Sequence, residues 1–273
     1  GIARNNLAHI DRYGNVDLLW NPNASGAVLA IAVSGSTVYV GGAFTGMGAS
    51  STTRNRLAAI GADGTLLAWN PSASGTVNAI AVSGTTVYVG GSFTTMGASS
   101  TSKTYLAAIG TDGTLLAWEP NANGAVNAIA VSGSQVYVGG AFTTIGGVTR
   151  NRLAAIGTDG TLNTTWNPNA NNTVNAIAIS GSMVYVGGAF TTMGGSTTRN
   201  FLAAIGTDGT LSTTWNTGGN GVYSVNAIAV SGSTVYVGGS FLSMGGSTRN
   251  YLAAIGTDGT LSSWNPSASS TVN

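Results

Sequence analysis

Short apolar runs alternate with turn residues along the chain, and the whole pattern recurs every 48 or 49 residues. In the copy that ends at Trp118, Val77–Val82 is a short apolar run, and Thr86–Gly91 is rich in β-branched and aromatic residues. Both segments are therefore predicted to be strands. Gly84 lies between them and tolerates the positive φ that a hairpin turn requires.

The second half of the copy predicts two further strands, Leu106–Ile109 and Thr114–Trp118, after a small polar loop at 93–102. Asp112-Gly113 is a strong turn signal between these two strands. Pro120 ends the ladder because proline has no N–H to donate. Each copy is thus predicted to form one antiparallel sheet of four short strands.

Such a sheet buries too little apolar surface to be stable alone, so the copies must stack face to face. Four-stranded repeats of this length are typical of propeller blades. We expect an all-β fold, a β-propeller of four-stranded antiparallel blades. Each copy ends in a tryptophan, which we interpret as a plug between blades and not as a stacking platform for a carbohydrate or a base. These residues are Trp20, Trp69, Trp118, Trp166, Trp215 and Trp264.

The repeats predict a single propeller domain, 1–273. Its parts are an outer half-blade at 1–25, full repeats at 26–74, 75–123, 124–171, 172–222 and 223–269, and the truncated start of a further repeat at 270–273. The half-blade has only the third and fourth strands of a copy. Gly1 in place of Met fits a processed product or an excerpt of a longer chain.

These ends favour a six-bladed ring that lacks the first two strands of one blade. The rival is a five-bladed ring with an extra N-terminal hairpin. In the six-bladed case we expect the missing hairpin to come from beyond Asn273 or from a neighbouring copy, because unpaired strand edges are templates for another chain. Donation between copies predicts self-association, and a filament where the rotation does not close.

Two motifs carry a resemblance to known propellers. They are Val87-Tyr88-Val89-Gly90-Gly91 and the segment from Leu106 to Leu115 that Trp118 follows. They resemble blades of quinoprotein-type propellers, and more closely the delta-sixty propeller repeats of bacterial and archaeal surface proteins. The resemblance covers essentially the whole chain and implies a propeller scaffold in extracellular or cell-surface proteins. Quinone-cofactor activity is not carried over, because the sequence has no acidic cluster to hold calcium or to act as the base.

Composition narrows the function further. Charged residues make up 6% of the chain, against the usual ~25%, and the net charge is +1. Solubility must therefore come from hydroxyl and amide groups, which suits an extracellular or cell-surface protein. A nucleic-acid partner is not expected, because the cations are few and spread out. The chain has no cysteine, and no apolar run approaches the ~20 residues of a membrane span.

The sequence predicts neither catalysis nor a cofactor or metal site. Five of the eight acids lie in the Asp-Gly turns and are interpreted as turn caps: Asp63, Asp112, Asp159, Asp208 and Asp258. The others are Asp11, Asp17 and Glu119, and no two carboxylates share a loop as glycoside hydrolysis would require. His9, the only histidine, replaces the alanine found at Ala59 and is expected to be structural. Nucleophilic catalysis therefore lacks its base.

Six cations occupy one equivalent position, where the third strand starts: Arg4, Arg54, Lys103, Arg150, Arg199 and Arg249. Because strands alternate in direction, these cations should lie on one face and the Asp-Gly turns on the opposite face. Hydrogen bonding to neighbouring loop carbonyls is the structural interpretation. The functional alternatives are a site for an acidic glycan or other anionic ligand, and a head-to-tail contact between rings.

Three Asn-X-Ser/Thr sequons are candidate glycosylation sites, Asn23, Asn163 and Asn171. Asn23 and Asn171 are predicted to lie in loops between repeats, where a glycan would be accessible. The sequence as a whole predicts a non-enzymatic structural or adhesive propeller, with glycan binding as the alternative function.

Overall fold

The computed structural model describes residues 3–219 and 223–273, which form only strands, turns and loops. Within these ranges no helix is long and apolar enough to cross a membrane. The chain divides into two compact units, Gly1–Asn121 and Ala122–Asn273. Each unit is therefore described by itself, and the single domain and the number of blades in a closed ring stay predictions. Residues 1–2 of the predicted half-blade and the predicted repeat end at 222 lie outside the described residues.

Each complete copy forms a three-stranded antiparallel sheet, as predicted for its first three strands. The first strands are β1 (Val28–Ser34), β6 (Val77–Ser83), β11 (Val126–Ser132), β16 (Val174–Ser180) and β21 (Val225–Ser231). The second strands are β2 (Thr37–Gly42), β7 (Thr86–Gly91), β12 (Gln135–Gly140), β17 (Met183–Gly188) and β22 (Thr234–Gly239). The third strands are β5 (Leu57–Gly61), β10 (Leu106–Gly110), β15 (Leu153–Gly157), β20 (Leu202–Gly206) and β25 (Leu252–Gly256).

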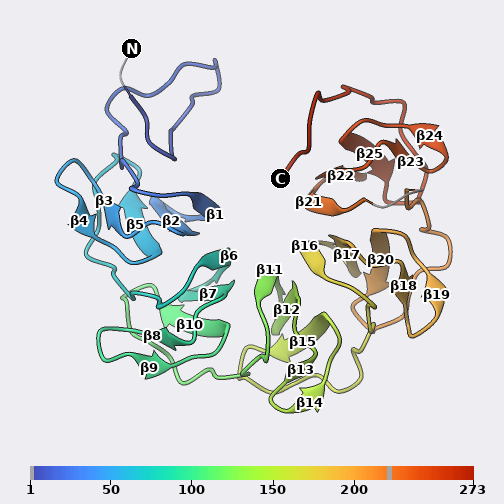
Figure 1. Ribbon diagram of the computed structural model, residues 1–273, viewed down its shortest axis with the longest axis horizontal. Coiled ribbons are helices and arrows are strands. Elements are labelled where there is room, and N and C mark those ends of the chain that lie inside the picture. The colour runs from blue at the N-terminus through green and yellow to red at the C-terminus, as the bar shows by residue number, and fades with distance from the viewer. Residues whose placement is uncertain (1–2, 220–222) are drawn as a thin grey trace. The chain divides into compact units, whose positions relative to one another are not determined.

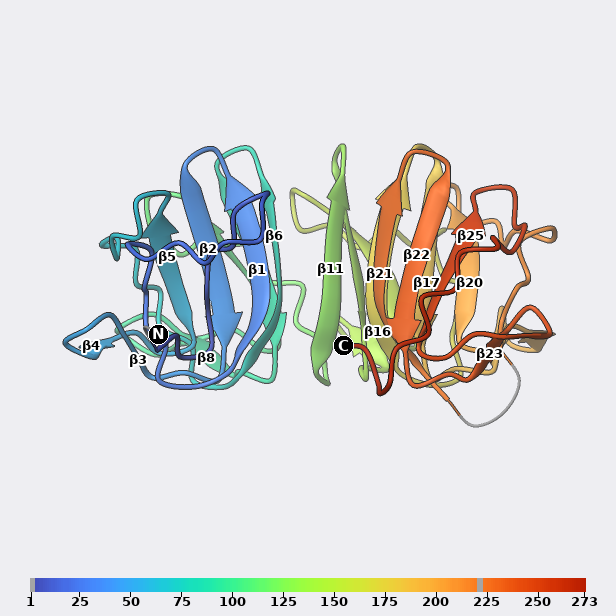
Figure 2. The same cartoon turned by 90° about the horizontal axis from the view of Figure 1, so that it is seen from above.

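The second strand lies in the middle of every sheet, as β22 does between β21 and β25 (Figure 2). In the second copy Ser83 pairs with Thr86 across a two-residue turn, and Gly84 has the positive φ of 56° that the turn requires. On the other side of the second strand Tyr88 pairs with Ala108. The predicted alternation of strands and turns is confirmed for these three strands.

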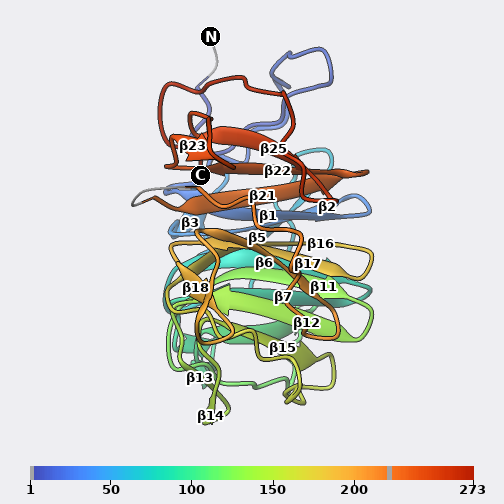
Figure 3. The same ribbon diagram turned by 90° about the vertical axis from the view of Figure 1, so that its right-hand side faces the viewer.

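The loop between the second and third strands contains a short hairpin that the sequence pattern did not predict. The pairs are β3 (Gly46–Met47) with β4 (Thr52–Thr53), β8 (Thr95–Met96) with β9 (Thr101–Ser102), β13 (Thr144–Ile145) with β14 (Val148–Thr149), β18 (Thr192–Met193) with β19 (Thr197–Thr198), and β23 (Ser243–Met244) with β24 (Ser247–Thr248). Figures 1 and 3 show the β13–β14 hairpin at the outer end of its blade, beyond β15. Two residues per strand give too little alternation to be recognised in a polar segment.

The predicted fourth strand differs from a regular strand. After the turn at Asp112, one bridge joins Ile109 to Leu115, and the N–H of Leu116 donates to the carbonyl of Ala108. The Leu116 carbonyl accepts from the Lys103 ammonium and not from another strand. The segment is therefore held by side chains as much as by a ladder, which explains why it is not a full strand.

A β-bulge in the first strand controls how neighbouring blades pack. The register shifts between Val77 and Ala79, so that Asn78 is the extra residue. A Cβ added to Gly41 of the preceding blade would lie 2.6 Å from Val77 Cγ1 and 3.0 Å from Ile80 Cδ1. The bulge thus turns both side chains toward Gly41, whose missing side chain leaves room for them. The Gly-Gly pairs that end the second strands therefore serve blade packing.

Apolar layers between neighbouring sheets form the core. In the first unit Tyr39, Leu57 and Trp69 of one blade are buried against Val77 and Val87 of the next. In the second unit Trp166 and Tyr137 are buried in the same way against Val174 and Val184. Stacked sheets of this kind bury the apolar area that one blade could not bury alone.

The two ends of the chain follow the repeat. Trp20 of the N-terminal half-blade is buried against the first complete blade, together with Phe44 and Ile60. At the other end the N–H of Val272 donates to the Gly239 carbonyl. Val272 lies against Gly238 as Val77 lies against Gly41. A Cβ added to Gly238 would lie 2.6 Å from Val272 Cγ1. Residues 270–273 thus take the position in which a first strand begins.

Candidate functional site

The five turn aspartates share one geometry. In the fourth copy Asp208 Oδ1 accepts the N–H of Thr210 at 2.9 Å, and Gly209 has a φ of 92°. This backbone hydrogen bond, with a weaker contribution from the Thr210 hydroxyl, lowers the pKa of Asp208 below its ordinary value. The other four show the same bond to the N–H two residues on and the same direction of pKa shift: Asp63, Asp112, Asp159 and Asp258. Their geometry is that of turn caps.

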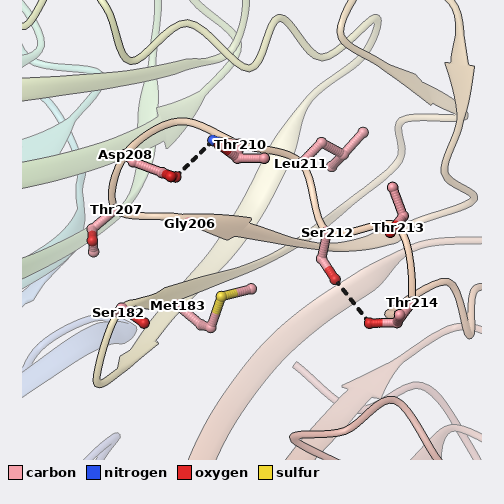
Figure 4. Close-up of a pocket in the computed structure, with 10 residues that line it drawn as sticks. All are labelled: Ser182, Met183, Gly206, Thr207, Asp208, Thr210, Leu211, Ser212, Thr213 and Thr214. Carbon is pink, nitrogen blue, oxygen red and sulfur yellow. Dashed lines mark hydrogen bonds between the residues drawn. The ribbon is translucent and has the colours of Figure 1, made fainter.

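A hydroxyl-lined notch lies beside these turns (Figure 4). In the fourth copy it has a volume of about 450 Å³. It is lined by Ser182 and Met183 on one side and by 206–208 and 210–214 on the other, Asp208 included. Equivalent notches of about 390 and 380 Å³ lie beside Asp258 and Asp112. The two kinds of turn therefore share one face of each blade, as predicted from strand direction.

The chemistry of the notch is limited to hydroxyls and one carboxylate. None of its lining residues is a histidine or a cation, and hydrogen bonds to the turn lower the pKa of its one carboxylate, Asp208, which makes it a weak base toward a nucleophilic hydroxyl. No group of three or more metal-binding side chains occurs within 3–219 and 223–273. Because the notch recurs with the repeat, it is a product of the blade architecture.

The six predicted cations reach main-chain carbonyls of the fourth strand. Arg199 is 5% exposed; its Nη1 donates to the Thr198 carbonyl at 2.8 Å and its Nη2 to the Ser212 carbonyl at 2.6 Å. Similar bonds are made by Arg4, Arg54, Arg150 and Arg249. Burial lowers the pKa of the Arg199 guanidinium. These arginines therefore fasten the fourth strand to the loop before the third.

Lys103 takes the same position with different chemistry. It is 2% exposed, and its Nζ donates to the Leu116 carbonyl at 2.9 Å and to Glu119 Oε1 at 2.6 Å. Glu119 is 46% exposed and lies at the end of the fourth strand. Glu119 thus provides a negative charge beside Lys103, whereas the five arginines at this position form no ion pair among the described residues. The terminal nitrogens of all six cations donate to protein acceptors, whereas the Nε atoms of the five arginines are buried and have no hydrogen-bond partner among the described residues.

The tryptophans connect each blade to the next turn. Trp69 Nε1 donates to the Gly110 carbonyl at 2.9 Å, and its ring meets Tyr39 edge-on at a centroid distance of 5.1 Å. The same donation joins Trp20 to Gly61, Trp166 to Gly206 and Trp215 to Gly256. The indole rings of these four tryptophans are therefore held between blades, as predicted for plugs, and do not form an exposed stacking surface.

His9 lies in the half-blade and is half-exposed. Its Nδ1 is 3.0 Å from Asp17 Oδ2, and its ring meets Trp20 edge-on at 6.0 Å. The bond to His9, with backbone N–H groups from Leu19 and Trp20, lowers the pKa of Asp17. Beside His9 is an apolar cavity of about 340 Å³, lined by Leu7, Ala8, His9, Trp20, Ile31, Val33, Val38 and Ala62. The sequence analysis missed this cavity, although alignment of the half-blade with the complete copies contained the signal for it.

The three sequon asparagines all make hydrogen bonds. Asn171 is exposed, and its Oδ1 accepts the N–H groups of Thr191 and Thr192. Asn163 Oδ1 accepts the N–H of Trp166, and Asn23 Oδ1 accepts a hydrogen bond from Asn5 Nδ2. Asn123 and the serines at 25 and 74 make the same loop-to-loop bond as Asn171. Glycosylation at these positions stays a prediction.

Comparison with known proteins supports the fold. The profile of a β-propeller domain of unknown function, DUF5122, matches residues 135–165. No curated protein matches the chain. The crystal structure of the computationally designed Ika8 protein is similar with a TM-score of 0.59 at 17% identity, over 90% of this chain and 64% of that one. The WD40 β-propeller domain of Doa1 is similar with a TM-score of 0.59 at 13% identity, over 91% of this chain and 71% of that one.

The chain is therefore a β-propeller repeat protein. The likenesses to solved structures concern the fold alone, because propellers with unrelated activities share one architecture. This chain also spans less than two thirds of the designed Ika8 chain.

Proposed function

We propose that this chain is a non-enzymatic structural or adhesive propeller module of the cell exterior. The proposal rests on one observation: the recurring polar and aromatic side chains bond to other groups of the same fold. The aspartates cap turns, the cations hold carbonyls of the fourth strand, and four of the tryptophans donate to neighbouring turns. Groups committed in this way stabilise blades and are not free to bind a substrate.

The location outside the cell is supported by the surface chemistry. With 6% charged residues, the chain owes its solubility to hydroxyl and amide groups. The resemblance to delta-sixty repeats of bacterial and archaeal surface proteins supports the same location. Protease treatment of intact source cells should release peptides of this chain. Peptides that appear only after lysis would contradict an exterior location.

The alternative function, binding of an acidic glycan by the six cations, has less support. An anion site needs donors that point to solvent, whereas the Nη atoms of Arg150 and Arg199 donate to carbonyls. No specific observation favours this function, and its discriminating measurement is given at the end of the Discussion.

The absence of catalysis is tested with a broad panel of hydrolase and oxidoreductase substrates. The purified chain should show no turnover above that of the variants His9→Ala, Asp208→Asn and Glu119→Gln. These remove the histidine, a notch carboxylate and one of the three carboxylates outside the Asp-Gly turns. Turnover that persists through purification and disappears in one of these variants would contradict the proposal.

A further inference from the structure

The third strand of the half-blade has one unpaired edge. Leu7 to Asp11 align with Leu57 to Gly61, which pair with β2 along their whole length. Within the described residues, the half-blade segment has one bridge, Ile10 to Val16, on its fourth-strand side. The side that faces a second strand in every complete blade has no strand partner in this part of the chain. A free edge of this kind is a template for another strand.

The cavity beside His9 corresponds to an occupied position in the next interface. Its lining residues Leu7, Trp20 and Ile31 are the counterparts of Leu57, Trp69 and Ile80. In that next interface the three counterparts form a buried cluster together with Tyr39 of the second strand. The 340 Å³ cavity is therefore the place where the tyrosine of a second strand would lie.

The first strand of the first complete blade is exposed over the same region. Ile31 and Val33 are 54% and 66% exposed, whereas Ile80, the counterpart of Ile31, is 9% exposed. Ile80 is covered by Gly41 and Tyr39 of the preceding second strand. The exposed face, the free edge and the cavity together match the outline of one first-strand and second-strand hairpin.

We propose that the half-blade accepts a β-hairpin with the sequence pattern of the first and second strands, from a segment outside residues 1–273. Main-chain groups of Leu7 to Asp11 pair with the second strand of this hairpin. Its tyrosine enters the cavity beside Trp20, and its Gly-Gly pair lies over Val28 and Ile31. This is strand addition to a sheet edge with a specificity pocket for one side chain.

A second copy of this chain is a poor donor. Each of its five hairpins, from β1–β2 to β21–β22, is already paired with a third strand of its own blade. Donation would open a complete blade to fill an incomplete one, with no net gain in paired edges. The donor is therefore a hairpin outside these five, one that is not paired with a third strand. The inference deepens the proposed scaffold function, and its test is independent of the search for turnover.

The first test uses a labelled 15-residue peptide with the sequence of Val225–Gly239, and fluorescence anisotropy. We expect saturable binding to the intact chain. Ile31→Ser in the chain should weaken it by at least about tenfold, because the variant lacks the apolar side chain that the hairpin would cover. Tyr236→Ser in the peptide should also weaken it. The matched control is Val148→Ser, which changes a 45% exposed apolar residue in β14 and should leave binding unchanged.

The second test traps the bound hairpin covalently, because a free hairpin is only marginally stable in water. An added Cβ at Gly41 lies 3.1 Å from Val77 Cβ, a few tenths of an ångström below the roughly 3.5–4.5 Å that separates the Cβ atoms of a disulfide, so a small backbone shift allows the bond. A peptide with Gly238→Cys should therefore cross-link to the Val28→Cys chain and not to Val148→Cys, and the natural chain has no cysteine to confuse the result. Equal cross-linking of both variants, or no saturable binding, would overturn the proposal. Self-association that Ile31→Ser abolishes would also overturn it, in favour of a second copy.

Discussion

Val272 lies against Gly238 in the arrangement that places Val225 against Gly187 one blade earlier. Both valines start a first strand, and both fill the space left by a glycine without a side chain. The amide of Asn226 continues the likeness, because it donates to Asn273 at 2.8 Å as Asn175 donates to Asn226 at 3.4 Å. The last four residues therefore make the contacts of an incoming blade.

This relationship predicts unequal costs for one substitution at two positions. Gly187→Ala places a methyl group against the buried Val225 of β21 and should destabilise the chain by about 1–3 kcal/mol. Gly238→Ala meets Val272, which can move away, and should cost less. Urea unfolding followed by circular dichroism measures both. Equal costs would mean that the blade contact does not control packing at these glycines.

Lys103 and Glu119 should contribute unequally to stability. Lys103→Met leaves buried carbonyls of Leu116 and Trp118 without their donor, at a cost of about 1–3 kcal/mol. Glu119→Gln removes only the charge of a half-exposed partner and should cost at most about 1 kcal/mol. Thermal unfolding of the two variants gives the comparison. A larger loss for Glu119→Gln would show that the ion pair, and not the carbonyl contacts, holds the strand.

The turn aspartates predict a loss of stability in acid. Because hydrogen bonds lower their pKa in the folded chain, their contribution is fully present above the unfolded pKa of about 3.9. It is lost as the pH falls from that value through the lower folded pKa. At pH values below about 4, the urea concentration at the unfolding midpoint should therefore decrease. Asp-to-Asn changes at all five turns should make this decrease smaller. An unchanged pH profile in this variant would exclude the turn caps as its source.

Substitution by phenylalanine should destabilise the chain more at Trp166 than at Trp264. Trp166 is fully buried and donates to the Gly206 carbonyl, so Trp166→Phe loses a buried hydrogen bond and should cost about 1–3 kcal/mol. Trp264 is 41% exposed, and no acceptor for its indole is present within the described residues. Trp264→Phe should therefore stay within about 0.5 kcal/mol of the natural chain. Differential scanning calorimetry measures the loss of stability in each variant. Equal losses for Trp166→Phe and Trp264→Phe would contradict the role of the bond between blades.

The sequence predicted the parts of the fold that depend on alternation and on turn chemistry. The predicted bounds of the second strand, Thr86 and Gly91, are both confirmed. The signal was clear because β-branched residues begin this strand and two glycines end it. The predicted fourth strand pairs with the third through one bridge, Ile109 to Leu115, and one of its carbonyls bonds to the side chain of Lys103, 13 residues earlier. Side-chain to main-chain contacts of this range have no periodic signal.

The candidate sites follow the same division. Composition and repeat spacing placed Asp208 in a turn and Arg199 at the start of a third strand, but they could not say whether the guanidinium faces solvent or a carbonyl. The cavity beside Trp20 arises from a residue position that the half-blade does not contain. Alignment of the half-blade with the complete copies shows that this position is missing, and the exposure of Ile31 against the burial of Ile80 places the cavity there.

The most direct test of the account compares Arg150→Met plus Arg199→Met with the natural chain, in thermal unfolding and in binding to an array of acidic glycans. The account predicts a clear fall in unfolding temperature, because two fourth strands lose their buried donors, and no glycan binding by either protein. Unchanged stability, with glycan binding by the natural chain that the double variant lacks, would contradict the structural role of the cations.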